Sequence, residues 1–150
     1  MKRKIFFFLL AILVVIQFFH PAKNQSAEIL SSDITKVTDV PVDVQAILKT
    51  ACYDCHSNST AYPWYNNIQP VAWWLNHHIE EGKGHLNFSA FGQYDAIKAA
   101  KKLKGIAREV EKGDMPLSSY TLIHRNAILN EDQKTLVINW AKHAVIKLPN

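Results

Sequence analysis

Apolar residues recur three and four positions apart in several stretches of this 150-residue chain, a spacing that indicates amphipathic helices. The pattern predicts a first helix that begins near Pro41 and runs into Cys52, and a second that begins at Pro70 and ends at Gly82 and Gly84. A third helix is predicted over residues 94–112 and ends at Gly113. The last helix is capped by Asn130, with Gln133 in the capping-box position. No strand pattern or internal repeat stands out. The predicted fold class is therefore all-α.

The same spacing predicts which side chains are buried. These are Val44, Ile47, Leu48 and Ala51 in the first helix, Val71, Trp74, Leu75, His78 and Ile79 on one face of the second, Ile97, Ala100, Leu103, Ala107 and Val110 in the third, and Leu136, Val137, Trp140, Ala141 and Ala144 in the last. Lys98, Lys101, Lys102 and Arg108 are expected on a solvated outer face of the third helix. Residues 57–69, 85–92 and 114–125 are predicted to be loops or irregular.

The amino-terminal residues have the pattern of a targeting segment. Lys2, Arg3 and Lys4 precede an apolar run of residues 5–19 that only Gln17 interrupts. As a helix this run is about 22 Å long, short of a bilayer core of about 30 Å, which favours a signal peptide. No small-x-small cleavage site follows it, which favours a retained anchor, and we expect the anchor. In both cases the basic end stays in the cytoplasm and the rest is exported, to the periplasmic side of the inner membrane.

Composition adds limits on function. Residues 1–22 are expected to be the signal or anchor segment, 23–40 a polar linker, and 41–150 a single domain. The formal net charge is +4, and Lys2, Arg3 and Lys4 account for three of these units, so the domain is nearly neutral and a nucleic-acid partner is not indicated. No small-molecule substrate is evident.

Both cysteines of the chain lie in one pentapeptide, Cys52-Tyr53-Asp54-Cys55-His56. A Cys-x-x-Cys-His motif is typical of covalent c-type haem attachment: two thiols on one turn reach the two vinyl groups, and the histidine ligates iron from the proximal side. Three alternatives fit the sequence less well. A thioredoxin-like cysteine pair would require a βαβ setting, and a structural zinc site would require about four ligands. A simple disulfide would leave His56 unexplained. One covalent haem c is the predicted cofactor.

A sixth iron ligand is expected at Met115, the only methionine besides Met1, in a loop that Pro116 stiffens. The rival ligands are His77, His78, His85, His124 and His143, of which His77 and His78 are the strongest. Three aromatic residues, Tyr62, Trp64 and Trp74, are candidates for packing on the haem, and covering the protein core is the equally plain alternative. His56 is expected to donate its other ring N–H to a backbone carbonyl, with Pro63 or Pro70 near enough in sequence to serve.

Four stretches resemble the bacterial haem-binding domain family of small exported proteins. They are residues 52–57, the segment Tyr62-Pro63-Trp64-Tyr65, residues 67–75, and Gly113-Asp114-Met115-Pro116-Leu117-Ser118-Ser119-Tyr120. The resemblance covers roughly residues 41–144 and implies haem binding. More distantly, the first helix that ends in the motif, the late Met-Pro loop and the closing helix look like a mono-haem class I cytochrome c.

We therefore expect a small cytochrome c-like domain around one haem, which carries single electrons to and from redox partner proteins, with the membrane contacted through the amino-terminal segment. It is expected to be an electron carrier rather than an enzyme. The alternatives are a haem peroxidase or a gas- or redox-sensing domain with an open distal site, and a small zinc-binding interaction module.

Overall fold

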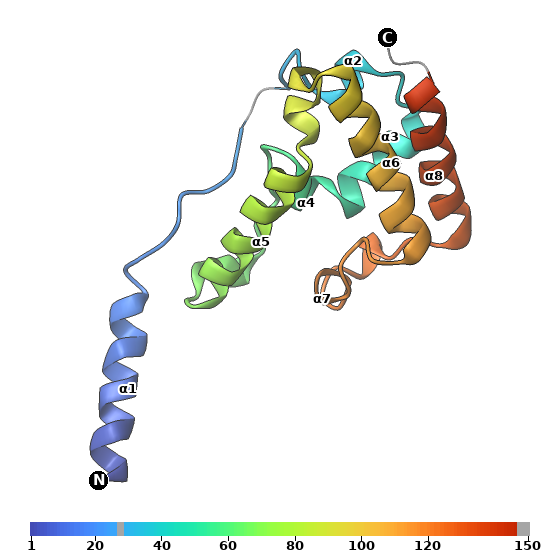
Figure 1. The fold of residues 1–150 in the computed structure, drawn as a ribbon. Helices are drawn as coiled ribbons and strands as arrows, with labels where there is room; N and C mark the ends of the chain where they lie inside the picture. The colour runs from blue at the N-terminus through green and yellow to red at the C-terminus, as the bar shows by residue number, and fades with distance from the viewer. Residues whose placement is uncertain (27–28, 147–150) are drawn as a thin grey trace.

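The computed structural model describes residues 1–26 and 29–146, and this part of the chain is helical (Figure 1). Its elements are α1 (Lys2–Ile16), α2 (Ile34–Val37), α3 (Val42–Ala51), α4 (Tyr53–His56), η1 (Trp64–Asn67), α5 (Val71–His85), η2 (Phe88–Gln93), α6 (Ala96–Lys112), α7 (Ser118–Thr121), η3 (Arg125–Ala127) and α8 (Glu131–Ile146). The described residues form no sheet, only an isolated antiparallel bridge between Gln25 and Ser59. The predicted all-α class is confirmed.

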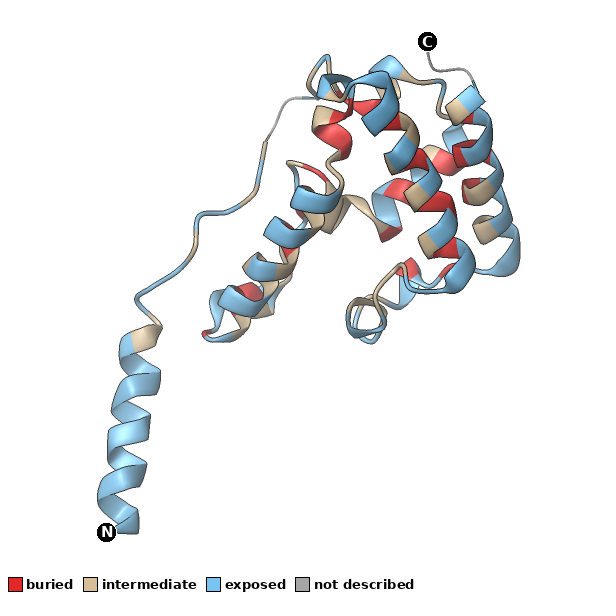
Figure 2. Cartoon of the chain, viewed as in Figure 1, coloured by how far each residue is buried: buried red, intermediate tan, exposed pale blue. Residues whose placement is uncertain are grey.

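The core lies where α6 and α8 pack side by side against α3, with their buried faces turned toward each other (Figure 2). Leu48, Leu103 and Val137 are almost completely buried there. Each such side chain stabilises the fold by about 1.5–3 kcal/mol relative to an exposed one. Phe88 and Phe91 of η2 extend the core toward α4 and α2.

The buried positions of α3 are those predicted, Val44, Ile47, Leu48 and Ala51. In α6 the prediction is wrong for Ile97, which is exposed, and Ala100 is only half-buried; the buried face holds Ala99, Leu103, Ile106, Ala107 and Val110. Ile97 is exposed because of where the helix begins. Asp95 caps α6 by accepting a hydrogen bond from Lys98 N at 2.7 Å, so Ile97 lies in the first turn, which no other element covers.

Two other helix faces also differ from the prediction. In α5 only Ala72 and Ile79 are buried, whereas Trp74 is exposed and Val71, Leu75 and His78 are half-buried, because this helix packs on the rest of the domain by a narrow stripe. In α8 Leu136 is exposed, and Val137, Trp140, Ala141 and Ala144 are buried as predicted.

The helix ends follow the predicted caps except in α5. Gly113 has a φ of 77° and ends α6. The capping box before α8 forms as predicted, with Gln133 N donating to Asn130 Oδ1 at 2.8 Å and Asn130 N to Gln133 Oε1 at 3.0 Å. Gly82 and Gly84, by contrast, lie within α5, which continues to His85. The loops expected over 57–69, 85–92 and 114–125 contain η1, η2 and α7.

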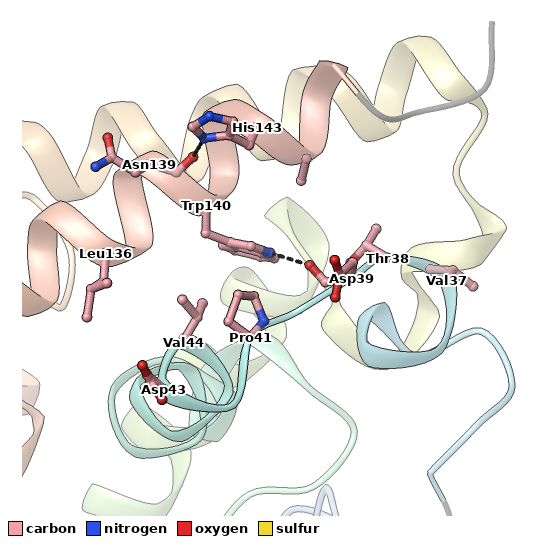
Figure 3. A pocket seen from close by; sticks show the side chains of 11 residues that line it. Val37, Thr38, Asp39, Pro41, Asp43, Val44, Leu136, Asn139, Trp140 and His143 are labelled. Atoms are coloured by element: carbon pink, nitrogen blue, oxygen red, sulfur yellow. Dashed lines mark hydrogen bonds between the residues drawn. The ribbon is translucent and has the colours of Figure 1, made fainter.

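Part of the segment expected to be a linker, 23–40, packs in the core. Ile34 is fully buried, and Asp33 is buried while its carboxylate accepts a hydrogen bond from Thr35 N, which caps α2. Figure 3 shows Trp140 pointing from α8 toward Asp39, whose carbonyl oxygen accepts a hydrogen bond from the indole at 3.1 Å. These contacts fix residues 33–39 against α8 beside a cavity of about 370 Å³.

The apolar amino-terminal residues form α1, whose side chains are exposed along nearly its whole length (Figure 2). Among the described residues, no helix combines the length and the apolar character that crossing a bilayer requires. The end of α1 is held to the domain by a reciprocal pair of hydrogen bonds: Gln17 Nε2 donates to Gln69 O at 3.2 Å, and Gln69 N donates to Gln17 Oε1 at 2.9 Å.

Candidate functional site

The cysteine motif lies at the junction of α3 and α4. Cys52 ends α3, and the single turn of α4 closes when His56 N donates to Cys52 O at 3.0 Å. One turn thereby carries both thiols and the imidazole, as the spacing predicts. Both thiols are free and half-buried.

The imidazole of His56 is oriented by the carboxyl-terminal part of α5. Its Nδ1 lies 2.9 Å from the carbonyl oxygen of Gly82 and 3.1 Å from that of Leu86. Both partners are acceptors, so Nδ1 carries the proton and donates, and Nε2 is left as the atom with a free lone pair. The expectation of a carbonyl from Pro63 or Pro70 is therefore wrong: closeness in sequence to the motif does not predict that α5 folds back over it.

Gly82 is the residue that allows α5 to approach the motif so closely. A Cβ at this position would lie 2.5 Å from Cys55 O, closer than real Cβ atoms approach, and 3.1 Å from Cys55 Cβ, which is also a tight contact. A glycine inside a helix costs about 1 kcal/mol relative to alanine. Here that cost is offset because the contact places two carbonyl oxygens on His56.

Burial sets the protonation of the three motif side chains. Desolvation raises the pKa of Cys52 to about 12, with a smaller effect from Cys55, and it raises the pKa of Cys55 to about 11, aided by the charge of Asp54. Desolvation lowers the pKa of His56, against the opposing effect of its two carbonyl partners. The thiols are therefore protonated and the imidazole neutral near pH 7, unlike the low-pKa thiolates of Cys-x-x-Cys redox enzymes.

The motif opens on a cavity of about 730 Å³ between α5 and α6. The structure brings five predicted site residues to its wall: Cys52, Cys55, His56, Met115 and Pro116. Lys101, Lys102 and Arg108, which were expected on a purely solvated face, also line it. The cavity is within the roughly 300–1,000 Å³ range typical of ligand and cofactor sites.

The residues around this cavity fit a haem. The donor set is two thiols, one imidazole with a free Nε2 and one thioether, and the basic side chains of α6 suit carboxylates such as propionates. Gly105, in the middle of α6, also lines the cavity, and a Cβ there would have no protein atom within 4 Å. Packing within the chain therefore does not require this glycine, but its missing side chain leaves room for a broad flat ligand.

Met115 is half-buried and lies on a loop that is held at both ends. At its start, Asp114 N and Met115 N both donate to Glu109 O, at 3.0 and 3.2 Å, which folds the loop back on the end of α6. At its end, the hydroxyl of Tyr120 donates to Asp54 Oδ2 at 2.7 Å. Burial and this hydrogen bond raise the pKa of Tyr120.

Asp54, inside the cysteine motif, thus ties the methionine loop to the Cys-x-x-Cys-His turn. Its other carboxylate oxygen accepts a hydrogen bond from Ala61 N at 3.0 Å, and its backbone oxygen accepts one from Thr60 Oγ1 at 2.6 Å. Sequence reasoning missed this role. The only signal was that Tyr120 ends one of the stretches that carry the family resemblance.

Three predicted haem-packing residues, Tyr62, Trp64 and Trp74, do not line the cavity. The Tyr62 hydroxyl accepts a hydrogen bond from Asn24 N at 2.7 Å. Trp64 is largely exposed and contacts Tyr65 edge-on, and Trp74 packs its ring edge-on against His78. These positions fit packing on the protein itself, or contact with another molecule, better than they fit packing on a haem.

The rival ligands are separated by the fold. His78 and His85 line the cavity, and both belong to α5, the helix whose Gly82 carbonyl bonds His56. His77 pairs with Glu81 at the surface, His124 bonds Tyr65 Oη, and His143 bonds Asn139 O. Within residues 1–26 and 29–146, no three His, Cys, Asp or Glu side chains gather as a metal site, and a structural zinc ion takes about four such ligands.

Fold and site together define a small all-α domain with a Cys-x-x-Cys-His turn facing a cavity that fits haem. A family model described as a haem-binding domain matches residues 11–143, and the chain belongs to this haem-binding domain family. No curated protein and no solved structure matches the chain.

The close contact at Gly82 predicts a contrast between two glycines of α5. Gly82→Ala should destabilise the protein by about 1–3 kcal/mol, because the added methyl group overlaps Cys55 and displaces the carbonyls from His56. Gly84→Ala is the matched control, since a Cβ there meets nothing within 4 Å, and it should be neutral or slightly stabilising. Urea unfolding of both variants measures the difference. Equal stabilities would show that the close approach is not required.

Proposed function

We propose that the chain carries one haem c, bound through thioethers from Cys52 and Cys55, with His56 as proximal and Met115 as distal iron ligand, and that it transfers single electrons. The observation that carries the proposal is the orientation of His56. Its Nδ1 is engaged by the carbonyls of Gly82 in α5 and of Leu86 just after it, so Nε2 is left free. His56 lines the same cavity as both cysteines and Met115.

Covalent attachment would require the protein mainly to position the two thiols beside the vinyl groups of the haem. Each thiol would add its S–H across one vinyl group, forming a C–S bond and placing the hydrogen on the other vinyl carbon, with no oxidant consumed. Cys52 and Cys55 are both free and lie on one turn, which would present both S–H groups to this addition. Haem, when bound, supplies the one-electron exchange between ferric and ferrous iron.

Electron transfer is favoured over catalysis by the two side-chain ligands. With His56 and Met115 both holding the iron of a bound haem, no position would be left for peroxide or a gas, and a thioether would favour ferrous iron. A peroxidase or a gas sensor would need Met115 to leave the iron. The partners expected for an electron carrier are other redox proteins.

We place the domain outside the cytoplasm, on the periplasmic side of the inner membrane, with the amino-terminal segment as its anchor. Lys2, Arg3 and Lys4 before the apolar helix α1 support this orientation, as does the export that covalent haem attachment of this kind requires. A reporter that is active only after export, fused after Asn150, should be active. The mature protein should keep its full mass, and loss of the residues before about Lys23 would exclude a retained anchor.

Covalent attachment predicts that haem stays with the polypeptide through acid–acetone extraction and denaturing electrophoresis. The double variant Cys52→Ser, Cys55→Ser should lose all haem staining, because a hydroxyl does not add to the vinyl group. Ser57→Ala, a change just outside the motif, is the control for general damage to the turn. Covalent haem in the double variant would contradict the assignment.

Ligation by Met115 predicts that Met115→Ala opens the distal position. Carbon monoxide should then bind the ferrous form readily, and the far-red thioether–iron charge-transfer band should vanish. The reduction potential should fall by on the order of 0.1 V, within the range of about 0.8 V that axial ligands set. Met115→His should remain low-spin with a still lower potential.

The matched comparison is His78→Ala, because His78 is the stronger of the two rival histidines that line the same cavity. Under thioether ligation this variant keeps the low-spin spectrum and the far-red band. If His78 were the ligand, His78→Ala would turn high-spin and Met115→Ala would leave the spectrum unchanged. An open distal site in the unmodified protein would be seen as a high-spin spectrum without either change.

A further inference from the structure

A surface rich in tryptophan lies at the beginning of α5 and has no role in the haem site. Residues 61–78 contain no Asp, Glu, Lys or Arg, yet they hold three of the four tryptophans of the chain. The exposed fractions are 76% for Trp64, 45% for Ile68, 41% for Trp73 and 49% for Trp74. We call these four side chains, from η1, the residue that follows it and the first turn of α5, the tryptophan patch.

The tryptophan patch is joined directly to the end of α1. Phe19 O accepts hydrogen bonds from Gln69 Nε2 at 2.6 Å and from Trp73 Nε1 at 2.9 Å. With the Gln17–Gln69 pair, these bonds fix the end of the apolar helix beside η1 and α5, and Figure 1 shows α1 running away from the domain at this end. Residues 5–22 also lack Asp, Glu, Lys and Arg, so the two uncharged surfaces are continuous.

The composition of the tryptophan patch matches a surface that contacts the bilayer interface better than one that binds a protein partner. Indole rings concentrate at the headgroup level of membranes, where the ring is partly buried and the N–H can bond. Protein docking surfaces usually add arginine or complementary charge, which the tryptophan patch lacks. The basic residues Lys2, Arg3 and Lys4 lie at the far end of α1, so the end beside the patch is the one that faces the outer surface.

We propose that the tryptophan patch docks the domain on the headgroup region of the bilayer that holds α1. This inference rests on the proposed location of the chain but adds a contact that the anchor alone does not provide. It has a consequence for the haem site. Trp74 contacts His78 with ring centroids 4.5 Å apart, and His78 lines the cavity, so docking holds the cavity within about one helical turn, roughly 6 Å, of the lipid surface.

The test uses the full haem-loaded chain labelled with 5-fluorotryptophan, in nanodiscs of phosphatidylethanolamine and phosphatidylglycerol. A spin label near the lipid headgroups should broaden the fluorine resonances of Trp64, Trp73 and Trp74. Trp140, buried in the core and bonded to Asp39, is the internal control and should stay sharp. The double variant Trp64→Gln, Ile68→Gln should reduce the broadening of Trp73 and Trp74 several-fold. The matched control Ile97→Gln, at an apolar side chain that is 85% exposed on α6, should not.

Each other outcome overturns the proposal in a distinguishable way. If the chain stays with the nanodiscs but the three resonances remain as sharp as that of Trp140, the docking proposal is wrong, while the proposed membrane anchor is kept. If the chain does not stay with lipid, or its mature mass lacks residues 1–22, the proposed location fails and docking fails with it. Broadening that depends on protein concentration without lipid would identify the patch as a contact between copies of the chain.

Discussion

The site depends above all on the contact between the α4 turn and the later half of α5. Gly82 lies so close to Cys55 that no side chain fits between them, and this approach places the carbonyls of Gly82 and Leu86 on Nδ1 of His56. One contact therefore fixes the tautomer of the imidazole, its plane and the direction of Nε2. The same contact makes α5 one wall of the cavity. Neither helix propensity nor burial would place α5 there by itself, since only a narrow stripe of α5 is buried.

The opposite wall is built by a second set of contacts that begins within the same motif. Asp54 accepts the Tyr120 hydroxyl, and Glu109 O accepts two backbone N–H groups at the start of the methionine loop. A hydrogen bond to a charged acceptor contributes about 1.5–3 kcal/mol, more than a typical neutral one. Asp54 thus couples the cysteine motif to α7, so that the two walls are positioned relative to the same four residues of α4. A change in α7 should be felt at the candidate site even though no residue of α7 is fully buried.

The sequence predicted what is local and missed what depends on the packing of distant segments. Caps such as Gly113 and the Asn130–Gln133 box are local, and so is the motif, whose spacing alone places two thiols and a histidine on one turn. Gly82 was misread as a helix end because a glycine that ends a helix and one that permits close approach look alike in a sequence. For Tyr62, Trp64 and Trp74 the sequence left haem packing and core packing equally open for a similar reason: composition identifies an apolar surface but not what that surface faces.

The geometry of His56 also bears on the choice of the distal ligand. Nδ1 points at α5, and the two ring nitrogens of an imidazole point in opposing directions, so Nε2 and any iron bound to it lie on the side of the ring away from α5. In the proposed ligation, the second side chain that holds the haem would come from the wall opposite α5. Side chains on α5, the helix that supplies the Gly82 carbonyl to His56, would be poorly placed for this role. His78 and His85 are on α5, whereas Met115 follows the end of α6 on the far wall. The orientation of His56, set by Gly82, therefore supports the proposed pairing with Met115 over a pairing with the histidines that line the same cavity.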